Sequence, residues 1–105
     1  MVSKGPVYAY DEKGVLRSVL NFDEQERRSG VQLAFSESGA VVRIETWRDG
    51  ILDGDWMDFD TATGAVAEYR KYSDGKQVGS STIFDTLGKP KPGKTEEERA
   101  AVPRF

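Results

Sequence analysis

Carboxylates are the residues of this sequence most able to do chemistry. Asp58 and Asp60 stand two apart on a predicted strand, and the acidic run 49–55 contains Gly50 and Gly54. Paired carboxylates serve acid–base catalysis, and acidic glycine-containing loops bind calcium. Strand neighbours on an open sheet form no sheltered site, and the run lacks the ligand spacing and final Glu of a calcium loop. We therefore interpret Asp60 as a turn-opening residue and Asp58 as a solvated strand residue.

The 105 residues contain no Cys and no His. The lack of Cys excludes disulfides, zinc–cysteine sites and thiol nucleophiles. The lack of His removes the commonest general base and the commonest metal ligand. No glycine-rich phosphate loop or serine elbow is visible either. We expect a protein that is not an enzyme and uses no cofactor or metal; the alternative is an enzyme restricted to carboxylates, Lys, Tyr or Ser.

The charge and hydropathy of the chain restrict its partners. The formal net charge is −3 and the pI is about 5.0, which argues against a nucleic-acid binder and fits a soluble protein with a basic partner. No run approaches the ~18 apolar residues that cross a membrane. The first residues resemble no secretion signal. We expect a cytoplasmic protein that binds neither nucleic acid nor a membrane.

Glycines and aromatic residues recur at a spacing of 24 or 25 residues. The glycine series are Gly14, Gly39, Gly64, Gly88 and Gly30, Gly54, Gly79. The aromatic series are Tyr10, Phe35, Phe59, Phe84 and Phe22, Trp47, Tyr72. Self-similarity at such a period means that one supersecondary unit is copied along the chain. We divide a repeat domain, residues 1–88, into units at about 5–29, 30–53, 54–78 and 79–88.

Each unit is predicted to be a β-hairpin, as the third one illustrates. Residues 54–60 and 65–72 have the alternation and the β-branched and aromatic content of strands. The intervening residues 60–64 have turn chemistry. Asp74-Gly75 is a tight-turn signal that returns the chain to the next copy. The first unit lacks such an Asp-Gly pair.

Residues 47–60 resemble a MORN repeat. Trp47, the pair Asp49-Gly50, Gly54 and the closing Phe59 occupy the positions of that motif. Residues 72–85 match it too, although Ser81 stands where Trp56 stands one unit earlier, and residues 22–35 form a degenerate copy. The extra turn at 60–64 resembles the MORN-like repeats of bacterial antitoxins or immunity proteins. The resemblance implies an all-β fold in which tandem β-hairpins form an elongated, curved, single-layer antiparallel sheet.

The C-terminal residues differ in composition from the repeats. Residues 89–94, rich in Pro and Lys, are predicted to be a linker. Thr95 and Glu98 form a capping-box pattern, so 95–105 is either a short helix folded over an end of the sheet or a frayed tail. Both edges of the sheet need protection, which charged residues, this segment or a partner could provide.

Trp56 is the leading candidate for a contact with a partner. Alternation places it on the face opposite Met57 and Phe59, beside acidic residues, as in an interface anchor; the alternatives are a sheet covered on both faces or a bulge that turns the ring inward. The pattern does not decide which face of strand 41–47 is the core. The candidate partner-binding residues are Trp56, Asp58, Asp60, Arg43, Glu45 and Asp49.

The resemblance implies a function in protein binding. The protein would be an immunity protein or antitoxin that occludes the active site of a cognate bacterial toxin, with acidic residues steering a basic toxin toward it. The alternative is a structural scaffold or a membrane-associated MORN module without a toxin partner. Arg27-Arg28 and residues 89–94 are the basic clusters that could contact anionic headgroups in that case.

Overall fold

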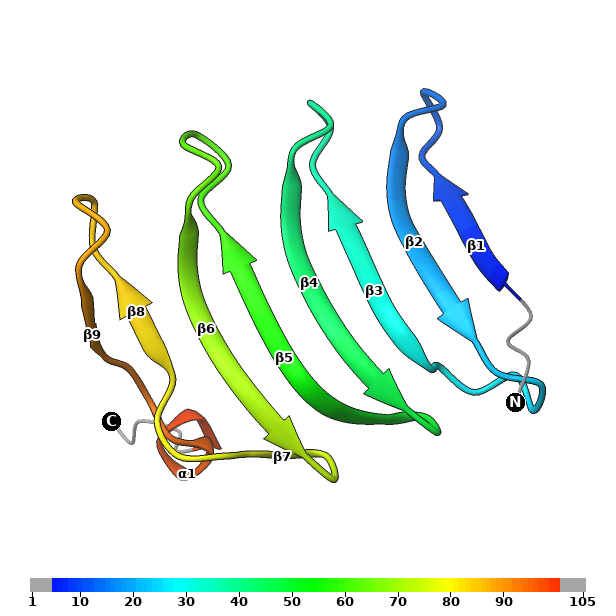
Figure 1. The fold of residues 1–105 in the computed structure, drawn as a ribbon. Coiled ribbons are helices and arrows are strands. Elements are labelled where there is room, and N and C mark those ends of the chain that lie inside the picture. The colour runs from blue at the N-terminus through cyan, green and yellow to red at the C-terminus, as the bar shows by residue number, and fades with distance from the viewer. Residues whose placement is uncertain (1–4, 101–105) are drawn as a thin grey trace, which may run out of the picture.

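A computed structural model of the chain describes residues 5–100. These residues form nine strands and a short helix: β1 (Gly5–Tyr10), β2 (Leu16–Phe22), β3 (Gly30–Phe35), β4 (Val41–Arg48), β5 (Ile51–Phe59), β6 (Val66–Ser73), β7 (Lys76–Gln77), β8 (Thr82–Phe84), β9 (Pro90–Pro92) and α1 (Glu96–Ala100). All strands belong to one antiparallel sheet that follows the chain order, with β7 attached to the end of β6 (Figure 1). The sheet is not closed, and the predicted all-β fold of successive hairpins with a C-terminal helix is confirmed.

In residues 5–100 the sheet is a single layer with no second layer packed on it. Among the described residues, no hydrophobic side chain is fully buried. The accessible surface is 7214 Å², whereas a compact protein of this mass exposes about 5,900 Å². The radius of gyration is 15.5 Å, against about 13 Å for a compact domain of this length. Each hairpin is therefore stabilised by its immediate neighbours rather than by a common core.

The strand registers separate two faces. One row crosses the whole sheet and is mainly apolar; this Met57 row contains Tyr8, Val19, Leu33, Ile44, Met57, Tyr69, Thr82 and Pro92. Because successive side chains alternate between faces, the neighbouring strand positions point to the other side. That side, called the Trp56 face, includes Gln32, Glu45, Trp56 and Arg70 in one row and Ser18, Ala34, Arg43, Asp58 and Glu68 in the next. The predicted apolar stripe exists, but it is only half-buried.

Two kinds of turn connect one unit to the next. Asp49-Gly50 and Asp74-Gly75 are two-residue reversals in which both residues have positive φ, 53° and 81° in the first and 50° and 84° in the second. This is the type I′ geometry that matches the twist of a hairpin. The first unit, which lacks Asp-Gly, uses a wider turn. Asp23 accepts the backbone N–H groups of Gln25 and Arg27, at 2.9 and 3.0 Å.

A side-chain amide completes the ladder between the first two units. Only two pairs of residues join β2 to β3. Beyond them Gln32, with 3% of its surface exposed, accepts the N–H of Asn21 and donates to the carbonyl of Asn21, each at 3.0 Å. A primary amide offers the same donor and acceptor as a peptide group. Gln32 therefore substitutes for a strand partner at this junction.

The segment 89–94 is not a linker, contrary to the prediction from its composition. Pro90–Pro92 forms β9, which pairs with β8 at the edge of the sheet. Proline has no N–H, so it fits a strand only where no donor is needed, as at an edge. Beyond β9, Gly93 donates to the carbonyl of Ser81 at 2.7 Å, and Ser81 donates to the carbonyl of Lys94 at 2.9 Å.

The C-terminal helix begins with the predicted capping box. The Thr95 hydroxyl accepts the N–H of Glu98 at 3.2 Å, and the Glu98 carboxylate accepts the N–H of Thr95 at 3.0 Å. Arg99 then donates to the side chains of Gln77 and Glu68. Of the two alternatives, a helix folded over the end of the sheet is the one observed for 96–100. The rest of the predicted segment, residues 101–105, lies outside the described residues.

Candidate functional site

Trp56 lies in the middle of the sheet, on the face predicted from alternation. Its strand β5 runs between β4 and β6, and the register sets Trp56 opposite Glu45 on one side and Arg70 on the other. The bulges that interrupt the ladder of β5 fall beside Glu45 and at Asp58, so neither turns the indole toward the Met57 row. The ring is half-buried by neighbours from its own face.

Two arginines lie against the indole of Trp56. The guanidinium carbons of Arg43 and Arg70 are 4.6 and 5.0 Å from the ring centroid, within cation–π range. The indole N–H donates to Asp58 at 3.0 Å. The ring of Tyr72 is 5.7 Å away, tilted by 52°. Side chains from three strands therefore fix one aromatic ring.

The acidic residues near Trp56 are paired with these arginines. Arg43 donates to Asp58 at 2.8 Å, and Arg70 approaches Asp58 at 3.8 Å and Glu68 at 3.3 Å. Asp58 is 24% exposed, so the interpretation of it as a solvated strand residue was wrong. The register places Arg43 of β4 on one side of β5 and Arg70 of β6 on the other. A half-buried carboxylate such as that of Asp58 requires partners of this kind. The cluster is therefore a charge-balanced array and not an acidic ring.

A second part of the array extends to the C-terminal helix. Glu68 accepts hydrogen bonds from the Ser81 hydroxyl, at 2.6 Å, and from Arg99. Arg99 also donates to Gln77 at 2.9 Å. None of these residues was predicted from the sequence to belong to the site. One signal was available, because Ser81 occupies the place of Trp56 in the last unit and departs from the repeat there.

The ionisation of the array follows from these contacts. Burial disfavours the charged form of Glu68, but the Ser81 hydroxyl, Arg99 and Arg70 outweigh it and hold the pKa below its usual value of 4.5. Burial likewise opposes the charge of Arg70, yet Tyr72 and Glu68 raise its pKa above the usual value. Within the described residues, the Nε of Arg70 is buried without a hydrogen-bond partner. Glu68 and Arg70 are both charged at neutral pH.

A smaller stack of the same kind lies beside β3. Arg28 is 5.2 Å from the ring centroid of Trp47, whose indole N–H donates to Glu45 at 2.7 Å. A shallow hollow of about 200 Å³ adjoins it, lined in part by Arg28, Arg43, Glu45 and Gln32. Pockets that enclose small molecules usually hold about 300–1,000 Å³. This hollow is therefore smaller than such pockets.

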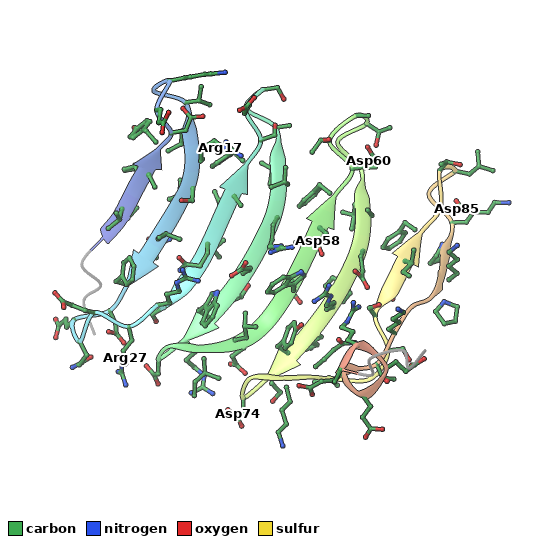
Figure 2. All side chains as sticks on the ribbon, turned by 180° about the vertical axis from the view of Figure 1, so that it is seen from behind. Arg17, Arg27, Asp58, Asp60, Asp74 and Asp85 are labelled. Carbon is green, nitrogen blue, oxygen red and sulfur yellow. The ribbon has the colours of Figure 1, made fainter. Side chains whose placement is uncertain are left out.

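Four of the six candidate residues gather here, and two lie elsewhere. Arg43, Glu45, Trp56 and Asp58 form the array, with Asp58 in the middle of the sheet in Figure 2. Asp60 opens a turn at one end of the strands and accepts the N–H of Ala62 at 2.8 Å (Figure 2). Asp49 is in a reversal at the opposite end, 3.4 Å from Arg27 and 3.7 Å from Arg48.

Three further features of residues 5–100 concern metal and membrane binding. No three acidic side chains in this part of the chain are grouped so that they could hold a metal ion. The helix that the structure describes is too short and too polar to cross a bilayer. The two basic clusters are far apart, since Arg27 is ion-paired with Asp23 at the end of β2 whereas β9 forms the opposite edge.

No protein-family model, curated protein or solved structure matches this chain. The geometry of the Trp56 face is the evidence that bears on function. That face is open and charge-balanced, and its aromatic residues are held in place by ion-paired arginines.

Proposed function

We propose that the chain is a protein-binding module that docks a partner on the Trp56 face. The observation that carries this proposal is the indole of Trp56, half-buried between Arg43 and Arg70 on one face of an open sheet. Tryptophan, tyrosine and arginine are the residues that most often dominate the binding energy of protein interfaces. Here all three types are within contact of one another.

The array is also organised before a partner arrives. Arg43, Asp58 and the indole N–H have their partners within the cluster. Binding that orders few side chains loses little conformational entropy, and this favours affinity. A standard interface needs about 800 Å² on each partner. The molecule measures 41 by 32 Å in its two longest directions, so one face is large enough.

The specific form of the proposal is an immunity protein or antitoxin that blocks the active site of a bacterial toxin. It is supported by the MORN-like pattern of residues 47–60 and by a small acidic chain without His or Cys. Exposed carboxylates at the turns, such as Asp60 and Asp74, would attract a basic toxin at long range. The ordered Trp56 face would then supply the short-range contacts.

The test is a pull-down from the source cell with three tagged proteins. Wild type and Val31→Ala, a change on the exposed Met57 face, are expected to retain one stoichiometric partner. Trp56→Ala is expected to lose it, with a circular dichroism spectrum like that of the wild type. Equal capture by Trp56→Ala and wild type would exclude the Trp56 face as the docking surface.

The specific form needs a separate experiment. Co-expression with a toxin encoded beside the gene is expected to restore growth, and the Trp56→Ala and Arg43→Glu variants are expected to protect less. A purified toxin that neither binds nor is inhibited by the protein would exclude the immunity role. That result would not contradict the more general claim of protein binding through the Trp56 face, which the pull-down tests separately.

A further inference from the structure

The β1 edge of the sheet is open and apolar. The strand Gly5–Tyr10 contains no charged residue. Val7, Tyr8 and Tyr10 are 50%, 54% and 62% exposed. They are three of the seven large hydrophobic residues that are exposed in the described part of the chain. An uncharged, exposed edge strand is a template for pairing with another strand.

The opposite edge is closed by the C-terminal segment. Its strand β9 has the sequence Pro-Lys-Pro, and prolines and lysines are the residues that block pairing at natural sheet edges. The helix α1 is fastened beside it through Arg99, which donates to Gln77 and Glu68. The sheet therefore has one edge that can accept a strand and one that cannot.

The backbone groups that β1 presents outward follow from the position of Pro6. Pro6 pairs with Asn21 of β2, and since proline has no N–H this must be a pair without direct hydrogen bonds. Alternation then directs the N–H groups of Val7 and Ala9 toward β2. The N–H and C=O groups of Tyr8 and Tyr10 and the C=O of Pro6 point away from the sheet.

We propose that a second copy of this chain pairs with β1 in an antiparallel manner, about a two-fold axis through Tyr8. Tyr8 of each copy donates to the carbonyl of Tyr8 in the other, and Tyr10 of each donates to the carbonyl of Pro6. All four outward N–H groups are then satisfied, and Pro6 leaves no donor unpaired. A strand that carries charge would repel its own copy across such an axis, whereas β1 carries none.

The closed edge at β9 limits this assembly to two copies. A two-fold contact uses the same surface on both partners and does not propagate. Tyr8 is the member of the Met57 row that lies at the β1 edge. In the dimer it would face Tyr8 of the other copy, so the row would continue from one copy into the next. A contact made by one strand edge is at the small end of protein interfaces, below about 1,200 Å². We therefore expect dissociation in the micromolar range.

Sedimentation velocity between about 1 and 200 μM tests the association. The wild type is expected to shift from monomer to dimer and no further. Tyr8→Lys places two ammonium groups opposite each other and is expected to remain monomeric. Val31→Lys, an equally exposed position on the same face but away from the edge, is the control and should dimerise like the wild type. A monomeric wild type, or a Tyr8→Lys dimer, would overturn the proposal.

Disulfide trapping tests the register, because the native chain has no cysteine. In a directly opposed hydrogen-bonded pair the Cα atoms are about 5.5 Å apart, within the range of a disulfide. Tyr8→Cys is therefore expected to form a covalent dimer under mild oxidation. Two Tyr10→Cys residues would be about 14 Å apart and are expected to stay unlinked. Efficient linkage of Tyr10→Cys but not Tyr8→Cys would exclude this register and with it the proposed dimer.

Discussion

Gln32, Trp56 and Ser81 occupy the same position in successive units, two residues after a repeat glycine. Each has a different task on the Trp56 face. Gln32 completes the backbone ladder, Trp56 stacks between two arginines, and Ser81 donates to Glu68. The repeat requires only that the side chain at this position fill the space beside an adjacent strand. The neighbouring side chains in each unit therefore determine which residue fits.

Replacing Gln32 by methionine tests its role as a ladder partner. The change keeps the length of the side chain but removes the acceptor of the Asn21 N–H, whereas the Asn21 C=O keeps the N–H of Ser29 at 3.0 Å. We expect the free energy of unfolding to fall by roughly 1–3 kcal/mol, measured by urea denaturation. Gln25→Met, in an exposed turn, is the control and should change it by less than about 0.5 kcal/mol. An equally small effect at Gln32 would show that solvent replaces the amide.

Glu68 should make stability dependent on pH. Its pKa in the folded state is below the usual 4.5, so ionised Glu68 stabilises the fold above that pH. This contribution is lost as the pH falls through the lower, folded-state value. We expect the midpoint of urea unfolding to be level near neutral pH and to decrease below about pH 4.5.

Substitution separates Glu68 from the other carboxylates in this pH profile. Glu68→Gln should be less stable than the wild type at pH 7 and should lose less stability on acidification. Glu97→Gln removes an exposed carboxylate from the same end of the molecule and should keep the wild-type slope. A Glu68→Gln profile parallel to that of the wild type would mean that the Ser81 and Arg99 contacts do not hold the charge.

At the scale of elements, the hairpins could be predicted from the sequence, but the side-chain contacts between neighbouring hairpins could not. Asp74-Gly75 and the capping box of Thr95 have local signatures, because the residues that create the geometry are adjacent in sequence. Arg70 faces Trp56 only once the register of two strands is known, and a shift of one residue would reverse the faces. The Pro-Lys-Pro strand was missed because proline is excluded from strands except at edges.

Gly93 tests how the C-terminal segment is attached. A Cβ at this position would lie 2.0 Å from the Ser81 Oγ and 2.9 Å from a side-chain carbon of Ile83. Gly93→Ala should therefore displace Ser81 from Glu68, at a cost of roughly 1–3 kcal/mol for the overpacking. We expect faster trypsin cleavage after Lys94 and Arg99 than in the wild type.

The control for Gly93 is Gly39→Ala. A Cβ at Gly39 would meet no atom within 4 Å, although φ is +88°. Its cost is then backbone strain alone, about 1–2 kcal/mol, at a turn far along the chain from the C-terminal segment. Cleavage after Lys94 should stay at the wild-type rate. Unchanged cleavage in Gly93→Ala as well would mean that the segment is not held by Ser81.

At the scale of the whole molecule, a single-layer sheet without a common core is stabilised in the manner of a one-dimensional array. Strand β5 is paired with β4 on one side and with β6 on the other. Strand β1 has a partner on one side, and β8 is joined to β6 by two pairs. Within residues 5–100 neither face is covered by a second layer, and the two edges differ because one of them is closed by β9.

This architecture predicts a gradient of local stability along the sheet. Opening of a terminal hairpin disrupts one interface, whereas opening β5 disrupts two, so local unfolding should begin at the ends. Hydrogen exchange at about 1 μM, where the proposed dimer is dissociated, should find the slowest amides in β4, β5 and β6. The hydrogen bonds that the amides of β1 donate to β2 should open with a free energy about 1–3 kcal/mol lower than those of β4, β5 and β6. This difference corresponds to a factor of roughly 5–150 in protection.

The same experiment at high concentration distinguishes fraying from dimer formation. Since the N–H groups of Tyr8 and Tyr10 point outward, they should exchange at nearly the rate of an unprotected peptide in the monomer. They should slow at about 200 μM only if another strand covers the edge. Equal protection of β1 and β5 at low concentration would contradict the gradient, because it would require the sheet to open as one cooperative unit despite lacking a shared core.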